Sequence, residues 1–172
     1  GHANQLAAVA RGHLVALAGR TSLLAGADER MFLDIDSLLR PVYGHHKQGA
    51  SFGHAKIASR ALLRLGLSPQ ITTISTATAP PVIAEAQLRS GKAGSGRAAA
   101  AQIKRAITTA RACGPTTTIM LRGDSAFGTK KVIATCCAEG VEFSLSVTRN
   151  KRITAALEGI DEAAYTPVHY PG

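Results

Sequence analysis

The chain has 172 residues, enough for one domain with a substantial core, and 45% of them are hydrophobic although only 4% are aromatic. No apolar run reaches the roughly 18 residues that a membrane-spanning helix needs. The N-terminus carries Arg11 and His13 inside its apolar pattern and has no cleavage site, which excludes a signal peptide. Twenty Lys and Arg against 11 Asp and Glu give a net charge of +9, which favours a polyanionic partner, nucleic acid first.

The first half of the chain predicts one helix followed by strands. Helical spacing over residues 4–19 indicates a helix that packs on a sheet or links to a further domain, and residues 1–29 form an N-terminal helical segment. Strand patterns follow at residues 31–38, 58–65 and 71–77. Residues 43–53 between them read as a basic, glycine-rich loop or hairpin. Pro80-Pro81 predicts the first turn of a helix over residues 82–88.

The second half predicts alternating helices and strands after a flexible loop at residues 90–96. The expected helices cover residues 97–113, 130–139 and 152–158, and the expected strands cover residues 118–121 and 142–148. Together with the first half, this order predicts an α/β fold: a mixed sheet of three antiparallel and then parallel strands, flanked by helices. Cysteines 113, 136 and 137 have no metal-ligand or disulfide spacing, which fits a cytoplasmic protein.

Two aspartates stand at the ends of apolar strands. Asp124 follows the run from Thr118 to Leu121 where the chain turns toward a helix, and this is where α/β folds place metal- and substrate-binding groups. Upstream, Asp34 and Asp36 alternate with apolar residues. Two aspartates on two core strands can share a divalent cation. The alternatives are a helix N-cap for Asp124 and an edge-strand surface carboxylate for Asp36.

Three segments carry a family resemblance: LDIDSLLRPVYGHHKQGASFGHAKI, TTISTATAPPVIAEAQLRSGKA and LRGDSAFGTKKVIATCCAEGVEFSLSVTRNKRITAAL. Their most specific motifs are Asp-x-Asp followed by Tyr-Gly and Lys-Gln-Gly-Ala, and Arg-x-Asp-Ser-x-Phe. In this order they resemble the DDE transposases of actinobacterial insertion sequences, in the family numbered thirteen-eighty. The resemblance runs from about Arg30 to the last residue.

The resemblance implies a partial RNase H-like catalytic domain over residues 30–172, in which the first and fourth strands are neighbours and bring Asp36 beside Asp124. Both would hold Mg²⁺ or Mn²⁺ for DNA cleavage and strand transfer. Asp36 is preferred to Asp34 because the family's carboxylate is the second in Asp-x-Asp, although Ser37-Leu38 departs from the usual residues that follow. The third carboxylate, a Glu, has no counterpart in this chain, so the chain alone is expected to be inactive. The implied partners are transposon-end and target duplexes, bound by a homodimer.

Basic residues near the expected strand ends are candidates for contact with the DNA backbone: Lys47, Arg122, Arg149 and Lys151. For each one the alternative is an ordinary surface charge. His45, His46 and His54 indicate a basic loop near phosphate or a solvated loop rather than a metal site. The spacing Gly91-x-x-x-x-Gly96-Arg97 approaches a phosphate-binding loop, but Arg97 and Ala98 replace its Lys and its hydroxyl. Two rival functions stay open: a truncated, non-catalytic remnant, and a basic DNA-binding module without chemistry.

Overall fold

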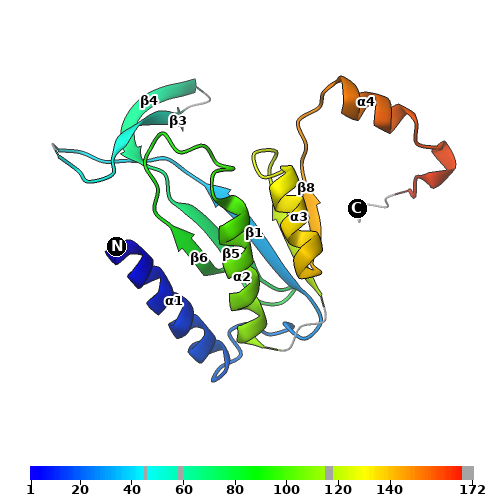
Figure 1. Ribbon diagram of the computed structural model, residues 1–172. Helices are drawn as coiled ribbons and strands as arrows, with labels where there is room; N and C mark the ends of the chain where they lie inside the picture. The colour runs from blue at the N-terminus through cyan, green and yellow to red at the C-terminus, as the bar shows by residue number, and fades with distance from the viewer. Residues whose placement is uncertain (45, 58–59, 115–117, 168–172) are drawn as a thin grey trace.

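A five-stranded mixed sheet forms the centre of the computed structural model, which describes residues 1–44, 46–57, 60–114 and 118–167 (Figure 1). The strand order is β6-β5-β1-β7-β8. Their bounds are β1 Met31–Ser37, β5 Gln70–Ser75, β6 Val82–Gln87, β7 Ile119–Gly123 and β8 Glu142–Leu145. β5 runs antiparallel to both of its neighbours, β6 and β1, whereas β1, β7 and β8 are parallel. The predicted mixed sheet flanked by helices is therefore confirmed.

The third antiparallel strand of this sheet is β6, and the helix predicted over residues 82–88 is wrong. β6 pairs with β5 from Ile74 opposite Val82 to Gln70 opposite Gln87, with an irregularity after Thr72. Pro80 and Pro81 precede the strand at the sheet edge, where a missing N–H costs no ladder bond. Pairing with β5 overrides the helix propensity of the Ala and Glu residues in this segment.

A smaller three-stranded sheet, ordered β2-β4-β3, is inserted between β1 and β5. Its strands are β2 Arg40–Pro41, β3 Ser51–Ile57 and β4 Arg60–Leu67. The segment predicted as a strand at residues 58–65 thus belongs to this second sheet, and its residues 58 and 59 lie outside the described part of the chain. Residues 43–53 were predicted as a loop or hairpin, and β3 begins at Ser51 within them. The hairpin alternative therefore describes the C-terminal end of that segment.

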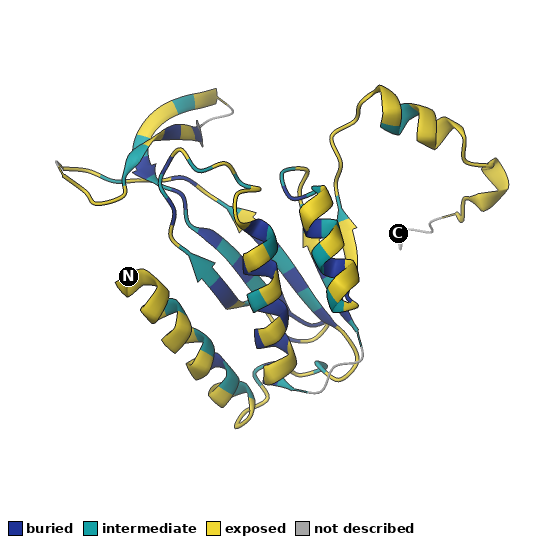
Figure 2. Ribbon diagram, in the orientation of Figure 1, coloured by how far each residue is buried: buried dark blue, intermediate teal, exposed yellow. Residues whose placement is uncertain are grey.

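Three helices lie along the central sheet: α1 His2–Ala18, α2 Ala99–Cys113 and α3 Lys130–Glu139. The fully buried side chains of α2, Ile103 and Ile107 among them, pack with Leu33 of β1 and Leu121 of β7 in one hydrophobic core. Figure 2 shows buried positions along α2 and the central strands. No helix among the described residues is long and apolar enough to cross a membrane.

The N-terminal helix α1 shares this core. It buries Leu14, and Arg11 donates to Glu85 of β6 over 2.8 Å; Glu85 also accepts from Arg105 of α2. The division between residues 1–29 and 30–172 stays a prediction. At the other end, α4 Lys151–Glu158 and the 3-10 turn Glu162–Ala164 bury no residue, and Figure 2 shows both as mainly exposed.

Three glycines bring the segment before α2 against the smaller sheet. A Cβ on Gly91 would lie 2.2 Å from the Ser51 carbonyl oxygen and 2.6 Å from that of Gly66, and a Cβ on Gly53 would lie 2.0 Å from the Gly91 carbonyl oxygen. The backbones therefore touch where any side chain would collide. Lys92 N donates to Ser51 Oγ over 2.9 Å at the same place.

A Gly91→Ala substitution should lower the free energy of unfolding by about 1–3 kcal/mol, the usual cost of forcing atoms into a packed contact. Urea denaturation measures the change. Gly94→Ala is the matched control in the same loop, because a Cβ there meets no atom within 4 Å. An equal loss in both variants would contradict the steric explanation.

Candidate functional site

The parallel strands β1, β7 and β8 all end at one edge of the central sheet. Asp34 pairs with Arg122 in the register of β1 and β7, and the last pair is Ile35 with Gly123, so Asp36 and Asp124 are the residues that follow this pair at that edge. β1 and β7 are neighbours, as the resemblance implied. Asp36 is still within β1, whereas Asp124 is the first residue after β7.

Asp36 stands on the central strand of the sheet, between β5 and β7, so the edge position in the surface-carboxylate alternative is wrong. It is exposed and shares the less buried face of β1 with Phe32 and Asp34, because side chains alternate along a strand. Its Oδ1 accepts from the Ser37 N–H over 2.6 Å. A recess beside it is also lined by Ser37 and by Arg40 of β2.

Asp124 begins the turn between β7 and α3. Its Oδ1 accepts from the Ala126 N–H over 2.9 Å, and its carbonyl accepts from the N–H of Phe127, whose ring is fully buried. The N-cap of α3 is Thr129, whose hydroxyl accepts from Val132 N, so the N-cap alternative for Asp124 is wrong. In each of the two aspartates, one carboxylate oxygen thus accepts a hydrogen bond from a backbone N–H. No hydrogen bond from a described residue reaches the other carboxylate oxygen.

Asp34 is committed to a different contact. Arg122 donates from Nε to Oδ1 over 2.6 Å and from Nη2 to Oδ2 over 2.7 Å, and its guanidinium lies 4.4 Å from the centroid of the Phe32 ring. The hydrogen bond to Asp34 raises the pKa of Arg122. Both oxygens of Asp34 are therefore in use, which favours Asp36 as the ligand. This contact also engages the Arg122 guanidinium within the protein, and its contact with DNA stays a prediction.

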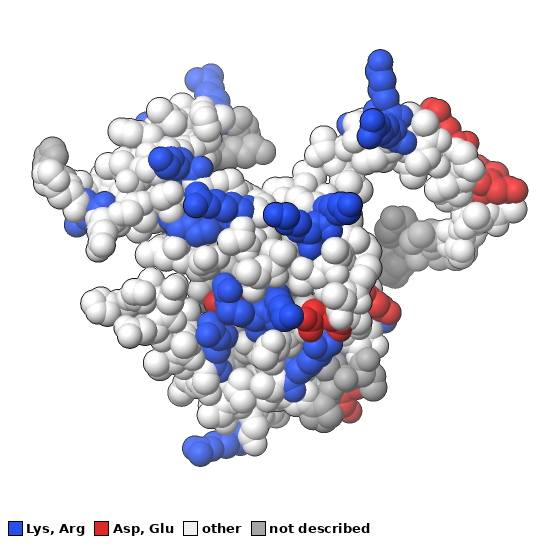
Figure 3. All heavy atoms as spheres, in the orientation of Figure 1, with Lys and Arg blue, Asp and Glu red and all other residues white. Residues whose placement is uncertain are grey.

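The structure separates the other predicted DNA contacts. Arg149 and Lys151 follow β8, and the Ser146 N–H donates to the Gly123 carbonyl, so this segment leaves the sheet beside the Asp124 turn. Lys47 lies in the loop between β2 and β3, which Figure 1 shows on the opposite side of the molecule from α4. Figure 3 shows Lys and Arg spread over several elements of the visible face rather than in one patch.

Oxygen ligands at the sheet edge fit Mg²⁺ or Mn²⁺, which bind through one or two carboxylates together with water and phosphate. Within the described residues, no three His, Cys, Asp or Glu side chains gather in one place. Asp36 and Asp124 as the ligands stay a prediction. His45 lies outside the described residues, and His54 stands on β3.

The loop at residues 90–96 was predicted to be flexible, but hydrogen bonds from Arg89 fix its backbone. This buried side chain donates to the carbonyl oxygens of Gly94, Ser95 and Arg97 and to both oxygens of Ser68, over 3.1–3.3 Å. The segment before the loop is strand β6, not a helix, but the substitutions at Arg97 and Ala98 still argue against a phosphate-binding loop. Sequence reasoning missed Arg89; its one visible signal was a cation directly before a glycine-rich segment.

Comparison with known proteins places the chain within a family model. The family model described as transposase DDE domain group 1 matches residues 8–170, a span that includes Asp34, Asp36, Arg122 and Asp124. None of the curated proteins matches the chain.

Proposed function

The chain belongs to the transposase DDE domain group 1 family, and on this premise we propose that it forms part of the catalytic domain of a bacterial insertion-sequence transposase. The proposed reaction is metal-dependent cleavage of DNA at transposon ends, followed by transfer of the 3′-hydroxyl to target DNA. The observation that carries the proposal is the parallel register of β1 and β7, whose last pair, Ile35 and Gly123, is followed directly by Asp36 and Asp124.

The proposed fold is RNase H-like, and the strand order supports it: three antiparallel strands, β6, β5 and β1, followed by parallel β7 and β8. The finer assignment to the thirteen-eighty family of actinobacterial insertion sequences rests on the quoted motifs. We place the protein on chromosomal and transposon DNA in the cytoplasm, as a homodimer in the DNA complex.

In this proposal Asp36 and Asp124 hold the divalent cation, Mg²⁺ or Mn²⁺. The cation, when bound, neutralises phosphate charge and lowers the pKa of a bound water or hydroxyl. The protein's own contribution is orientation. The Ser37 and Ala126 N–H groups fix one oxygen of each carboxylate, leaving the second oxygen of each for the cation. The Asp34–Arg122 pair fills the same face directly before them.

Binding of Mn²⁺ to the 172-residue chain tests this pair directly. Paramagnetic broadening of amide NMR signals should be strongest at Ser37, Ser125 and Ala126. It should disappear in Asp36→Asn and in Asp124→Asn, because each removes one of the two ligands. Asp34→Asn should keep the broadening, since both carboxylate oxygens of Asp34 accept hydrogen bonds from Arg122.

Glu158→Gln, which removes one exposed carboxylate from α4, is the matched control and should also keep the broadening. Broadening centred on other carboxylates, or unchanged in Asp124→Asn, would place the metal elsewhere. A basic DNA-binding module without chemistry would show no metal-dependent change at this edge.

A further inference from the structure

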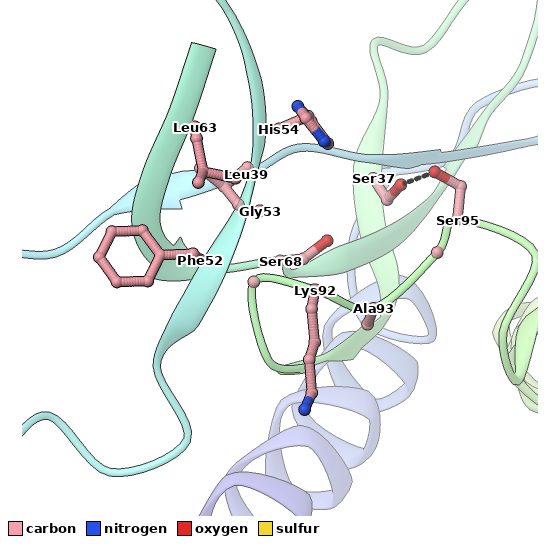
Figure 4. Close-up of a pocket in the computed structure, with 12 residues that line it drawn as sticks. Ser37, Leu39, Phe52, Gly53, His54, Leu63, Ser68, Lys92, Ala93 and Ser95 are labelled. Carbon is pink, nitrogen blue, oxygen red and sulfur yellow. Dashed lines mark hydrogen bonds between the residues drawn. The ribbon is translucent and has the colours of Figure 1, made fainter. Parts of the chain in front are cut away.

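A pocket of about 400 Å³ opens between the smaller sheet and the loop that precedes α2 (Figure 4). Its volume lies within the range of small-ligand sites. In Figure 4, Leu39, Leu63 and Phe52 lie on one side of the pocket, and the hydrogen-bonded pair Ser37 and Ser95 lies on the other. Neither the candidate carboxylates nor the basic residues predicted to bind DNA are among its lining residues.

The apolar side of the pocket carries an exposed aromatic ring. Phe52 and His54 stand two residues apart on β3 and so share one face of the smaller sheet, and Leu63 of β4 is the cross-strand partner of His54. Phe52 is 61% exposed and Leu63 is 55% exposed. An exposed ring beside a pocket is a platform on which an unpaired base can stack.

The polar side of the pocket carries one cationic side chain, Lys92. Lys92 and His54 line the pocket and are exposed, and none of its described lining residues is Asp or Glu. Arg89 of the same loop region donates its hydrogen bonds to backbone carbonyls and to the Ser68 hydroxyl. None of them reaches a carboxylate of a described residue. This buried positive charge has no ion-pair partner there, so the loop favours an anion, and a phosphate is the anion that accompanies a base.

The pocket lies next to the candidate site. Ser37 Oγ donates to Ser95 Oγ over 2.7 Å at its edge, and Ser37 directly follows Asp36 on β1. Ser37 lines both this pocket and the recess beside Asp36. A nucleic-acid strand that reaches Asp36 can therefore place a neighbouring nucleotide in the pocket.

We propose that this pocket binds one unstacked nucleotide of a DNA strand, with its base against Phe52 and its phosphate near Lys92. The choice of DNA rests on the proposed function; the stacking platform and the positive loop do not. Because bases inside a duplex have their faces covered, the pocket should accept a nucleotide from an unpaired end or a flipped position.

Fluorescence binding measurements with the 172-residue chain test the proposal, with a chelator present so that no metal site contributes. The probes are a duplex with a single-stranded 3′ overhang that carries a fluorescent adenine analogue, and the same duplex with blunt ends. The wild-type chain should prefer the overhang, and Phe52→Ala should lose roughly 5- to 100-fold in overhang affinity, the range expected for one stacked base. Phe52→Leu should lose the ring but keep the apolar packing, and should show a similar loss.

Phe143→Ala is the matched control, because Phe143 is an exposed phenylalanine of β8 outside the pocket. Equal binding of both duplexes by the wild-type chain, or an equal loss in Phe143→Ala, would overturn the pocket assignment. The combined Asp36→Asn and Asp124→Asn variant should keep the overhang preference. Failure of the metal site would therefore leave this result standing, and failure of the pocket would leave the metal site untouched.

Discussion

An Asp124→Asn substitution should lower the rate of Mg²⁺-dependent DNA cleavage by about a thousandfold, measured in a transposase whose complete catalytic domain includes this chain. The amide keeps the size of the side chain and its contact with Ala126 N but removes the charge that holds the cation. Loss of metal catalysis is worth several kcal/mol of transition-state stabilisation, and each 1.36 kcal/mol is tenfold in rate. Asp36→Asn should have the same effect. The measurement is the rate of strand cleavage on a transposon-end duplex.

DNA binding separates a catalytic from a structural role for Asp124. Affinity measured by gel shift should stay nearly unchanged in Asp124→Asn, because phosphate contacts come from basic groups. Asp161→Asn, at the exposed turn after α4, should retain full activity. The 172-residue chain alone should cleave only at the background rate, since its described residues hold no cluster of three acidic or other metal-ligating side chains. Metal-dependent cleavage that survives Asp124→Asn would show that the site is elsewhere.

The central part of the fold could be predicted because its signals are local. Alternation of apolar and polar residues marks β1, and Gly140, with φ of 63° after α3, marks a helix end that favours glycine. Asp36 and Asp124 could be proposed as a pair because the two strands that carry them have strong apolar patterns. Their juxtaposition came from the family resemblance, and the register of β1 and β7 agrees with it.

The parts that could not be predicted depend on contacts between distant residues. β6 has helix-favouring residues, and only its pairing with β5 makes it a strand. The Asp34–Arg122 pair joins residues 88 positions apart, so a separate role was predicted for each of them. The pocket beside Phe52 exists because Gly53, Gly66 and Gly91 let three backbone segments touch, and no single segment carries that information.

Arg89→Met should lower the free energy of unfolding by about 3 kcal/mol, the largest stability effect we expect from a single substitution in the loop region. The side chain is only 8% exposed, and burial lowers its pKa, with a smaller effect from Arg97. Methionine fills a similar volume but leaves the carbonyls of Ser68, Gly94, Ser95 and Arg97 without their donor. Each hydrogen bond to a charged group contributes about 1.5–3 kcal/mol, and part of this loss is recovered where the carbonyls reach water.

Arg89→Lys distinguishes charge from geometry at this position. A lysine keeps the positive charge, but its compact ammonium has only three donors and cannot reach acceptors on both sides as a planar guanidinium does. The free energy of unfolding should therefore still fall by about 2 kcal/mol. Urea denaturation measures both variants. Arg97→Met is the control: Arg97 is exposed and repels Arg89, so its removal should leave stability within about 0.5 kcal/mol of the wild type. If Arg89→Lys were as stable as the wild type, the charge alone, and not the guanidinium network, would hold the loop beside Asp36.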